Sequence, residues 1–212
     1  MFRLIKREIQ DSMMYFLLTL ILTSIFIFVD IFLAYYSSDT GEVAIDINNS
    51  FTIFVISTFL FVITAMGVSQ MHSDRSKKIS SFLSTLAVTR DKILIARVIA
   101  GILAILLFFI PQIAAISVVY NLFITPTFAF DNMFIDVYII ASLIAMSCYC
   151  IGLHIGWTSQ RQIPLLAALP CAFVLITIMY IKGFGIQALF LLVLFIAAYL
   201  IRIRDNFITS SL

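Results

Sequence analysis

The chain has 212 residues, of which 63% are hydrophobic and 11% are charged, and its formal net charge is +2. Its mean hydropathy of +1.14 excludes a soluble globular domain and predicts an all-α integral membrane protein. No linker, repeat or low-complexity segment divides the sequence, so we expect residues 1–212 to form a single transmembrane domain. Lipid is then the expected surrounding, and no nucleic acid is expected among the partners.

The first twelve residues predict a short helix that lies on the inner leaflet of the membrane. Phe2, Ile5, Ile9 and Met13 recur at helical spacing, whereas the basic residues fall elsewhere around the helix. The alternative is an ordinary basic flank, whose positive charges only keep this end of the chain on the cytoplasmic side of the membrane. The apolar run that follows is too long for a signal peptide and lacks a small-residue cleavage site, so we expect it to be retained.

Six apolar runs follow in the chain, each long enough to cross a bilayer core about 30 Å thick as a helix of about 20 residues. The predicted spans are residues 13–36, 51–71, 93–120, 136–157, 164–181 and 185–201. Most Lys and Arg residues fall before span 1, between spans 2 and 3, and after span 6. Basic residues are retained on the cytoplasmic side, so we predict a multi-pass protein of the cell membrane with both termini in the cytoplasm.

Asp30 is the one carboxylate within the first predicted span, toward its outer end. Acidic residues inside a membrane are usually paired or functional. Asp30 is therefore a candidate contact for a cationic cargo or a candidate proton carrier. The alternative is that its side chain only reaches the outer interface.

The longest charged stretch, residues 72–92, separates spans 2 and 3 and predicts a cytosolic amphipathic helix. Its apolar residues follow the spacing i, i+3, i+4, i+7: Ile79, Phe82, Leu83 and Leu86. Thr89 is a candidate cap for the next helix, Asp91 lies in the first turn of that helix, and Arg97 is expected near the inner interface. By spacing alone, the apolar stripe covers either the protein's own bundle, lipid or a partner.

The sequence around this stretch resembles the coupling segment in permease subunits of the type 2 ABC exporter family. That family also carries an amphipathic N-terminal helix and six spans. Its segment reads acidic, Gly, Glu, two leucines, Pro, Val, Ser, Arg, then Ile and a small residue before a basic one. The residues that fit in register are Asp74, Leu83, Leu86, Val88, Thr89, Arg90, Ile93, Ala96 and Arg97. Lys78, Ser81 and Ala87 depart from it, standing near the usual Gly, Glu and Pro.

The resemblance implies a permease subunit that couples ATP hydrolysis elsewhere to the export of a small or amphipathic substrate. The sequence has no GxxxxGK[ST] loop, so ATP and Mg²⁺ would be bound by a separate cytosolic ATPase subunit, with no cofactor on this chain. A second permease, identical or related, would complete the transporter. The implied contacts with the ATPase are Asp74, Arg75, Ile79, Phe82, Leu83, Leu86, Thr89 and Arg90.

The fourth span carries two further patterns. Cys148, Cys150 and His154 lie close in sequence, but the two cysteines point about 200° apart on a helix, so no metal site is expected. Gly152 and Gly156 form a GxxxG pair, which predicts close helix packing either within one chain or across a dimer.

Two other functional classes remain open from the sequence. A substrate-binding membrane subunit of a vitamin-type importer would also borrow its ATPase, but such a subunit does not need its own amphipathic cytosolic helix. An intramembrane enzyme would need a site assembled from dispersed residues, because the sequence has no HExxH or GxSxG motif and only His72 and His154 as candidate bases. We therefore expect a chain without catalytic activity of its own.

Overall fold

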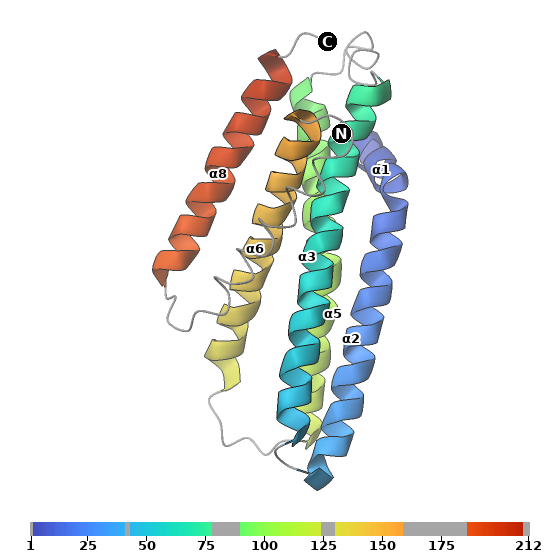
Figure 1. Cartoon of the computed structure of the whole chain (residues 1–212), viewed down its shortest axis with the longest axis vertical. Helices are drawn as coiled ribbons and strands as arrows, with labels where there is room; N and C mark the ends of the chain where they lie inside the picture. Colours follow the sequence, from blue (N-terminus) through green and yellow to red (C-terminus); the bar gives the residue numbers. More distant parts are fainter. Residues whose placement is uncertain (1, 41–42, 78–89, 124–129, 159–185, 210–212) are drawn as a thin grey trace.

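The computed structural model describes residues 2–40, 43–77, 90–123, 130–158 and 186–209, which are helical apart from a turn at Ser12. These residues form an elongated bundle of helices (Figure 1). The helices are α1 (Phe2–Asp11), α2 (Met13–Thr40), α3 (Val43–Lys77), α5 (Arg90–Phe123), α6 (Phe130–Thr158) and α8 (Ile186–Thr209). The prediction of an all-α fold is confirmed for the described part of the chain.

Four of these helices contain a stretch long and apolar enough to cross a membrane. The stretches are Met13–Phe32, Phe54–Ser73, Asp91–Val118 and Tyr138–Gly156, and they coincide with the first four predicted spans. Many large apolar side chains on α2 and α5 are exposed, which suits a surface covered by lipid rather than water. The fifth predicted span, residues 164–181, lies outside the described residues. The sixth overlaps α8, which is not one of the four membrane-length stretches.

The helices run past the ends of the predicted spans. α2 continues to Thr40 and α3 begins at Val43, so most of the polar stretch expected to connect spans 1 and 2 is helical. α3 also continues to Lys77, through the first residues of the predicted coupling segment. Hydropathy marks only the apolar part of a helix, whereas the backbone hydrogen bonds that extend it are local and do not require lipid.

α3 and α6 form the most extensive helix pair of the bundle, and α2 packs against both α3 and α5. α8 lies beside α6, and α1 packs against α5 near the end of the bundle that is uppermost in Figure 1. The turn at Ser12 joins α1 to α2. The Ser12 N–H donates to the carbonyl oxygen of Glu8 at 3.0 Å, and the Tyr15 N–H donates to the Ser12 carbonyl at 2.9 Å.

Four aromatic rings lie together between α3, α5 and α6, and we call them the aromatic cluster. Phe59 stacks on Phe108 with ring centroids 3.7 Å apart, and Phe109 meets both rings edge to face. Tyr138 adds a fourth ring, edge to face with Phe109 at 6.0 Å. Phe59, Phe108 and Phe109 are buried, so the cluster is a packed part of the core.

Candidate functional site

The face of α1 that points into the bundle is polar. Glu8 and Ser12, one helical turn apart, are only 4% and 2% exposed. Phe2, from the predicted apolar stripe, is 81% exposed, and Met13 is also exposed, whereas Ile9 packs partly against the core. The short helix at the N-terminus is therefore present, and it uses polar side chains to hold the bundle while part of its apolar stripe faces outward.

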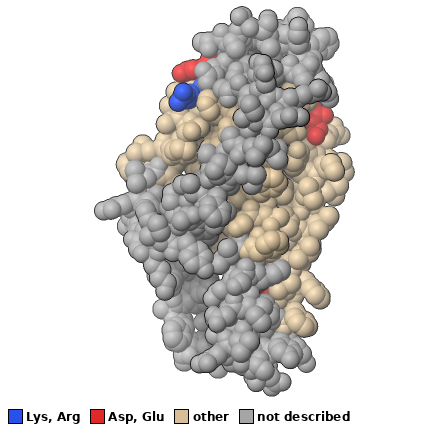
Figure 2. Space-filling view, in the orientation of Figure 1, with Lys and Arg blue, Asp and Glu red and all other residues tan. Residues whose placement is uncertain are grey.

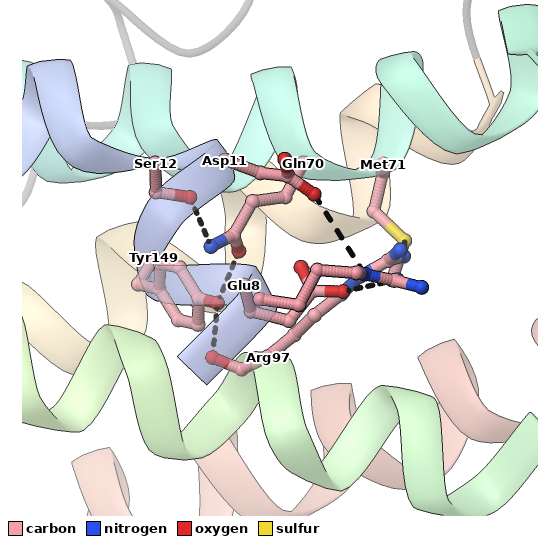
Figure 3. A network of polar contacts seen from close by, with 8 residues as sticks. Glu8, Asp11, Ser12, Gln70, Met71, Arg97 and Tyr149 are labelled. Atoms are coloured by element: carbon pink, nitrogen blue, oxygen red, sulfur yellow. Dashed lines mark hydrogen bonds and ion pairs between the residues drawn. The ribbon is translucent and has the colours of Figure 1, made fainter. Parts of the chain in front are cut away.

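Glu8 pairs with a fully buried arginine. Its Oε2 lies 3.4 Å from Nε of Arg97, a residue that is 1% exposed, and its Oε1 accepts a 2.9 Å hydrogen bond from Arg7 (Figure 3). Arg97 also lies with one guanidinium nitrogen 3.3 Å from the sulfur of Met71. Arg97 is thus buried between helices, and its expected place near the inner interface stays a prediction. A buried guanidinium is tolerated there because a carboxylate opposes its charge.

Tyr149 and Gln70 extend these contacts to α6 and α3. The Tyr149 hydroxyl lies 2.6 Å from Oε1 of Gln70 and 2.8 Å from the carbonyl oxygen of Arg97, so two acceptors share one donated proton. Gln70 in turn donates from Nε2 to the Ser12 hydroxyl at 2.9 Å. We call the resulting set the buried polar network, and it joins α1, α3, α5 and α6 (Figure 3). Its members are Glu8, Ser12, Gln70, Met71, Arg97 and Tyr149.

A glycine makes room for the Tyr149 ring. A Cβ at Gly101 would lie 2.5 Å from two ring carbons of Tyr149. Gly101 is one turn beyond Arg97 on α5, so the tyrosine passes over the glycine to reach the Arg97 carbonyl. A larger residue at this position would push the hydroxyl away from both acceptors.

Three more glycines bring α3 and α6 into backbone contact, and we call them the glycine seam: Gly67, Gly152 and Gly156. A Cβ at Gly67 would lie 2.7 Å from the carbonyl oxygen of Tyr149, and one at Gly156 would lie 2.6 Å from that of Val68. Gly152 lies against the backbone of Thr64 in the same way. The GxxxG pair thus packs against a helix of the same chain. This close approach fixes the position of α6 along α3, and with it the position of Tyr149 relative to Gln70.

The sequence-predicted ATPase contacts fall mainly outside the described residues. Asp74 and Arg75 belong to the last turns of α3, and Arg90 is the first residue of α5. Ile79, Phe82, Leu83, Leu86 and Thr89 lie outside the described part of the chain. The ends of α3 and α5 that flank them are at the same end of the bundle as α1 (Figure 1). Asp91 occupies the first turn of α5, as predicted, and pairs with Arg204 of α8 at 3.1 Å.

Asp30 lies on α2 within the Met13–Phe32 stretch, well separated along the helix from the buried polar network. Its Oδ2 is buried and has no hydrogen-bond partner among the described residues. An intramembrane carboxylate in this state is a candidate site for a ligand or a proton.

The described residues offer little for a metal or for covalent chemistry. Among them, no group of three or more His, Cys, Asp or Glu side chains is arranged to hold a metal ion. Cys148 and Cys150 are both buried, and the ring of His154 meets the ring of Tyr199 at 90° with centroids 5.7 Å apart. These side chains therefore contribute to packing between α6 and its neighbours, including α8.

The charged groups visible on the described surface in Figure 2 lie mostly in its upper part. Most of the other described surface in this view, drawn in tan, carries neither acidic nor basic side chains. This segregation is what a membrane-spanning bundle requires, since charge is costly in hydrocarbon and favourable at its edge.

Sequence reasoning missed Glu8, Ser12, Gln70 and Tyr149 as parts of one site. One signal was present: Glu8 is the single acidic residue among the first ten, where Arg3, Lys6 and Arg7 are basic. Another was the position of Gln70 and Arg97 at the ends of apolar runs. Neither signal identifies the partner of each side chain, which only the packing of the helices defines.

Comparisons of this chain with models of protein families, with curated proteins and with solved structures find no match. The resemblance to type 2 ABC exporter permeases therefore stays a prediction, based on the sequence pattern between Asp74 and Arg97 and on the predicted layout of spans.

Proposed function

We propose that this chain is the membrane-spanning permease subunit of an ATP-driven exporter, coupled to a separate cytosolic ATPase that binds ATP and Mg²⁺. Two permeases, identical or related, would enclose the path of a small or amphipathic substrate. The chain would cross the cell membrane six times with both termini in the cytoplasm. The basic residues at the ends of the chain and between spans 2 and 3 support this orientation.

The observation that carries the proposal is the position of the buried polar network relative to residues 78–89. Gln70 lies seven residues before the end of α3, and Arg97 lies seven residues after the start of α5. Each is therefore about 10 Å from the helix end that flanks the segment. If a partner moved residues 78–89, the adjoining ends of α3 and α5 would move with them. The hydrogen bonds and ion pair of the network would then transmit this movement to α1 and α6.

The chemistry of the network supports a mechanical role rather than a catalytic one. Its side chains are bonded to one another, with Glu8 opposite Arg97 and Tyr149 beside Gln70. Catalytic groups must instead meet a substrate at hydrogen-bonding distance. A fully connected polar network inside an apolar bundle rigidifies it, which is what a transducer between an ATPase and a transport path requires.

The end of the bundle that carries α1 is also suited to docking of the ATPase. α1, the start of α5 and the end of α8 lie at the same end of the bundle (Figure 1). The Arg204–Asp91 ion pair joins α8 to α5 there. In the proposed orientation this end faces the cytosol, where Phe82 and Leu83 would be buried against the ATPase and Arg75 and Arg90 would add charge complementarity.

The proposal is tested by affinity purification of the chain in mild detergent, with mass spectrometry of the proteins that remain bound. We expect a roughly stoichiometric partner that carries a GxxxxGK[ST] loop. The double variant Phe82→Asp/Leu83→Asp should lose this partner. The matched control Phe2→Asp adds one charge at an exposed apolar residue of the same end of the bundle and should keep it. Recovery of the chain alone would refute the proposal.

A further inference from the structure

The buried polar network fixes which side of α1 faces outward. Glu8 and Ser12 point into the network, so the polar side of the helix lies against the bundle (Figure 3). Phe2 and Lys6 lie one turn apart on the other side of α1, and both are exposed, Phe2 by 81%. We call Phe2 and Lys6 the outer face of α1. It presents an aromatic ring and, one turn later, a basic side chain.

α1 lies at the depth where a membrane changes from headgroups to acyl chains. Arg97, which pairs with the α1 carboxylate, is six residues inside the Asp91–Val118 stretch, or about 9 Å along α5. Gln70, which bonds to the Ser12 hydroxyl, is three residues inside the Phe54–Ser73 stretch, or about 4.5 Å along α3. Interfacial helices bury their apolar side about 5–10 Å into this boundary. The network thus holds α1 at the depth of an interfacial helix.

The surface next to α1 is apolar and exposed. α1 slants away from the axis of α2, and the turn between them leads directly into the first membrane-length stretch (Figure 1). Met13 and Met14 are 58% and 76% exposed, and Leu17, one turn further along α2, is 51% exposed. A membrane-spanning helix with this surface is covered by acyl chains. Lipid is therefore the expected neighbour of α1.

The charges of α1 favour an anionic headgroup. Three of the first ten residues are basic and one, Glu8, is acidic. Glu8 is turned inward to Arg97, which removes its negative charge from the outer side of the helix. Asp11, the other carboxylate, pairs with Arg7 at 3.8 Å. Lys6 is exposed and is bound by neither carboxylate, so the outer face of α1 presents a positive charge.

We propose that the outer face of α1 is a binding site for an anionic phospholipid, with the Phe2 ring among the acyl chains and Lys6 beside the headgroup phosphate. A zwitterionic headgroup carries an ammonium group that opposes the charge of Lys6, so it binds less favourably. Glu8 leaves the same short helix toward Arg97. An anionic lipid on one side of α1 therefore stabilises the position of the buried polar network on the other.

The test uses the full chain in lipid bilayers with one tryptophan as reporter. The single tryptophan of the sequence is removed by Trp157→Phe, and a new one is introduced by Phe2→Trp at an exposed position. Bromine on an acyl chain quenches tryptophan fluorescence on contact. Mixtures of phosphatidylglycerol and phosphatidylcholine, with one lipid brominated at a time, therefore give the relative affinity of the two lipids for this position. We expect about a fivefold preference for phosphatidylglycerol, the effect of one basic side chain near anionic lipid.

Two controls distinguish a site from general attraction to the membrane. Lys6→Gln in the reporter chain should reduce the preference to less than about twofold. Lys92→Gln removes an exposed charge near the start of α5 and should leave the preference unchanged. A second reporter chain with Phe28→Trp, at a residue that is 70% exposed and about 22 Å along α2, should bind both lipids equally.

Equal affinities in the Phe2→Trp reporter overturn the inference, as does an unchanged preference in Lys6→Gln or the same preference in the Phe28→Trp reporter. If the outer face of α1 docks the ATPase instead, both lipids bind equally and Phe2→Asp loses the ATPase in the affinity purification. No ATPase or ATP is present in the lipid experiment. A lipid preference in a chain that captures no ATPase would therefore refute only the proposed function.

Discussion

Replacing Glu8 by Met tests whether the buried ion pair holds α1 on the bundle. The variant removes the carboxylate oxygen that lies 3.4 Å from Nε of Arg97, a residue that is only 1% exposed. Removing one partner of a buried ion pair costs about 3–5 kcal/mol. The long 3.4 Å separation between Nε and Oε2 favours the lower end, so we expect a loss of about 3 kcal/mol in the free energy of unfolding.

The reciprocal variant Arg97→Met should cost less, about 1–2 kcal/mol. The buried Glu8 carboxylate then still has a cationic partner, because its 2.9 Å contact with Arg7 remains. Arg7 itself is partly exposed, so water also stabilises its charge. Methionine also fills much of the volume that the arginine stem occupies. The double variant replaces the pair by two apolar side chains and should be more stable than Glu8→Met alone.

These free energies are measured by titrating detergent-solubilised protein with SDS and following helix content by circular dichroism. The loss of unfolding free energy in the double variant should be smaller than the sum of the two single losses, by at least about 2 kcal/mol. Asp11→Asn is the control, because its ion pair with Arg7 is exposed and 3.8 Å long, and it should stay within about 0.5 kcal/mol of the native protein. Additive single losses, or a Glu8→Met loss no larger than that of Asp11→Asn, would refute the reasoning.

Three smaller perturbations test other contacts by the same titration. Tyr149→Phe removes the hydroxyl shared by Gln70 and the Arg97 carbonyl and should cost about 1–2 kcal/mol; a neutral change would show that water replaces it. Gly67→Ala places a Cβ 2.7 Å from the Tyr149 carbonyl oxygen and should destabilise the protein by at least about 2 kcal/mol, against the gain of up to about 1 kcal/mol expected from helix propensity alone. Arg204→Gln breaks an exposed pair and should cost less than about 0.5 kcal/mol, and a larger loss would mean that the pair anchors α8.

The existence of the four long apolar helices could be predicted from the sequence, because a bilayer imposes a minimum length of apolar residues. Their ends could not, since helical hydrogen bonding continues through polar residues, as at Thr40 and Lys77. The N-terminal helix was also predictable from its spacing, but the orientation of its faces was not. Near a membrane, an apolar stripe can face lipid while polar side chains face protein, and here Phe2 is exposed whereas Glu8 is buried.

The candidate site was only partly predictable. Asp30 was identified because a carboxylate in an apolar run is unusual by itself. Tyr149, a member of the buried polar network, carries no such signal, since a lone tyrosine reads as one more aromatic residue within a long apolar helix. Its role depends on the hydrogen bonds of its hydroxyl to Gln70 and to the Arg97 carbonyl, which result from helix packing rather than from local sequence.

The glycine seam limits how the bundle can deform. Sliding one helix along another normally requires only that flexible side chains change rotamer. Between α3 and α6 the surfaces in contact are backbone, and the Thr64 and Val68 carbonyls sit in notches left by Gly152 and Gly156. Backbone atoms have no rotamers to exchange, so a register shift would have to separate the two helices first. We therefore expect α3 and α6 to move together as one rigid unit when the protein rearranges.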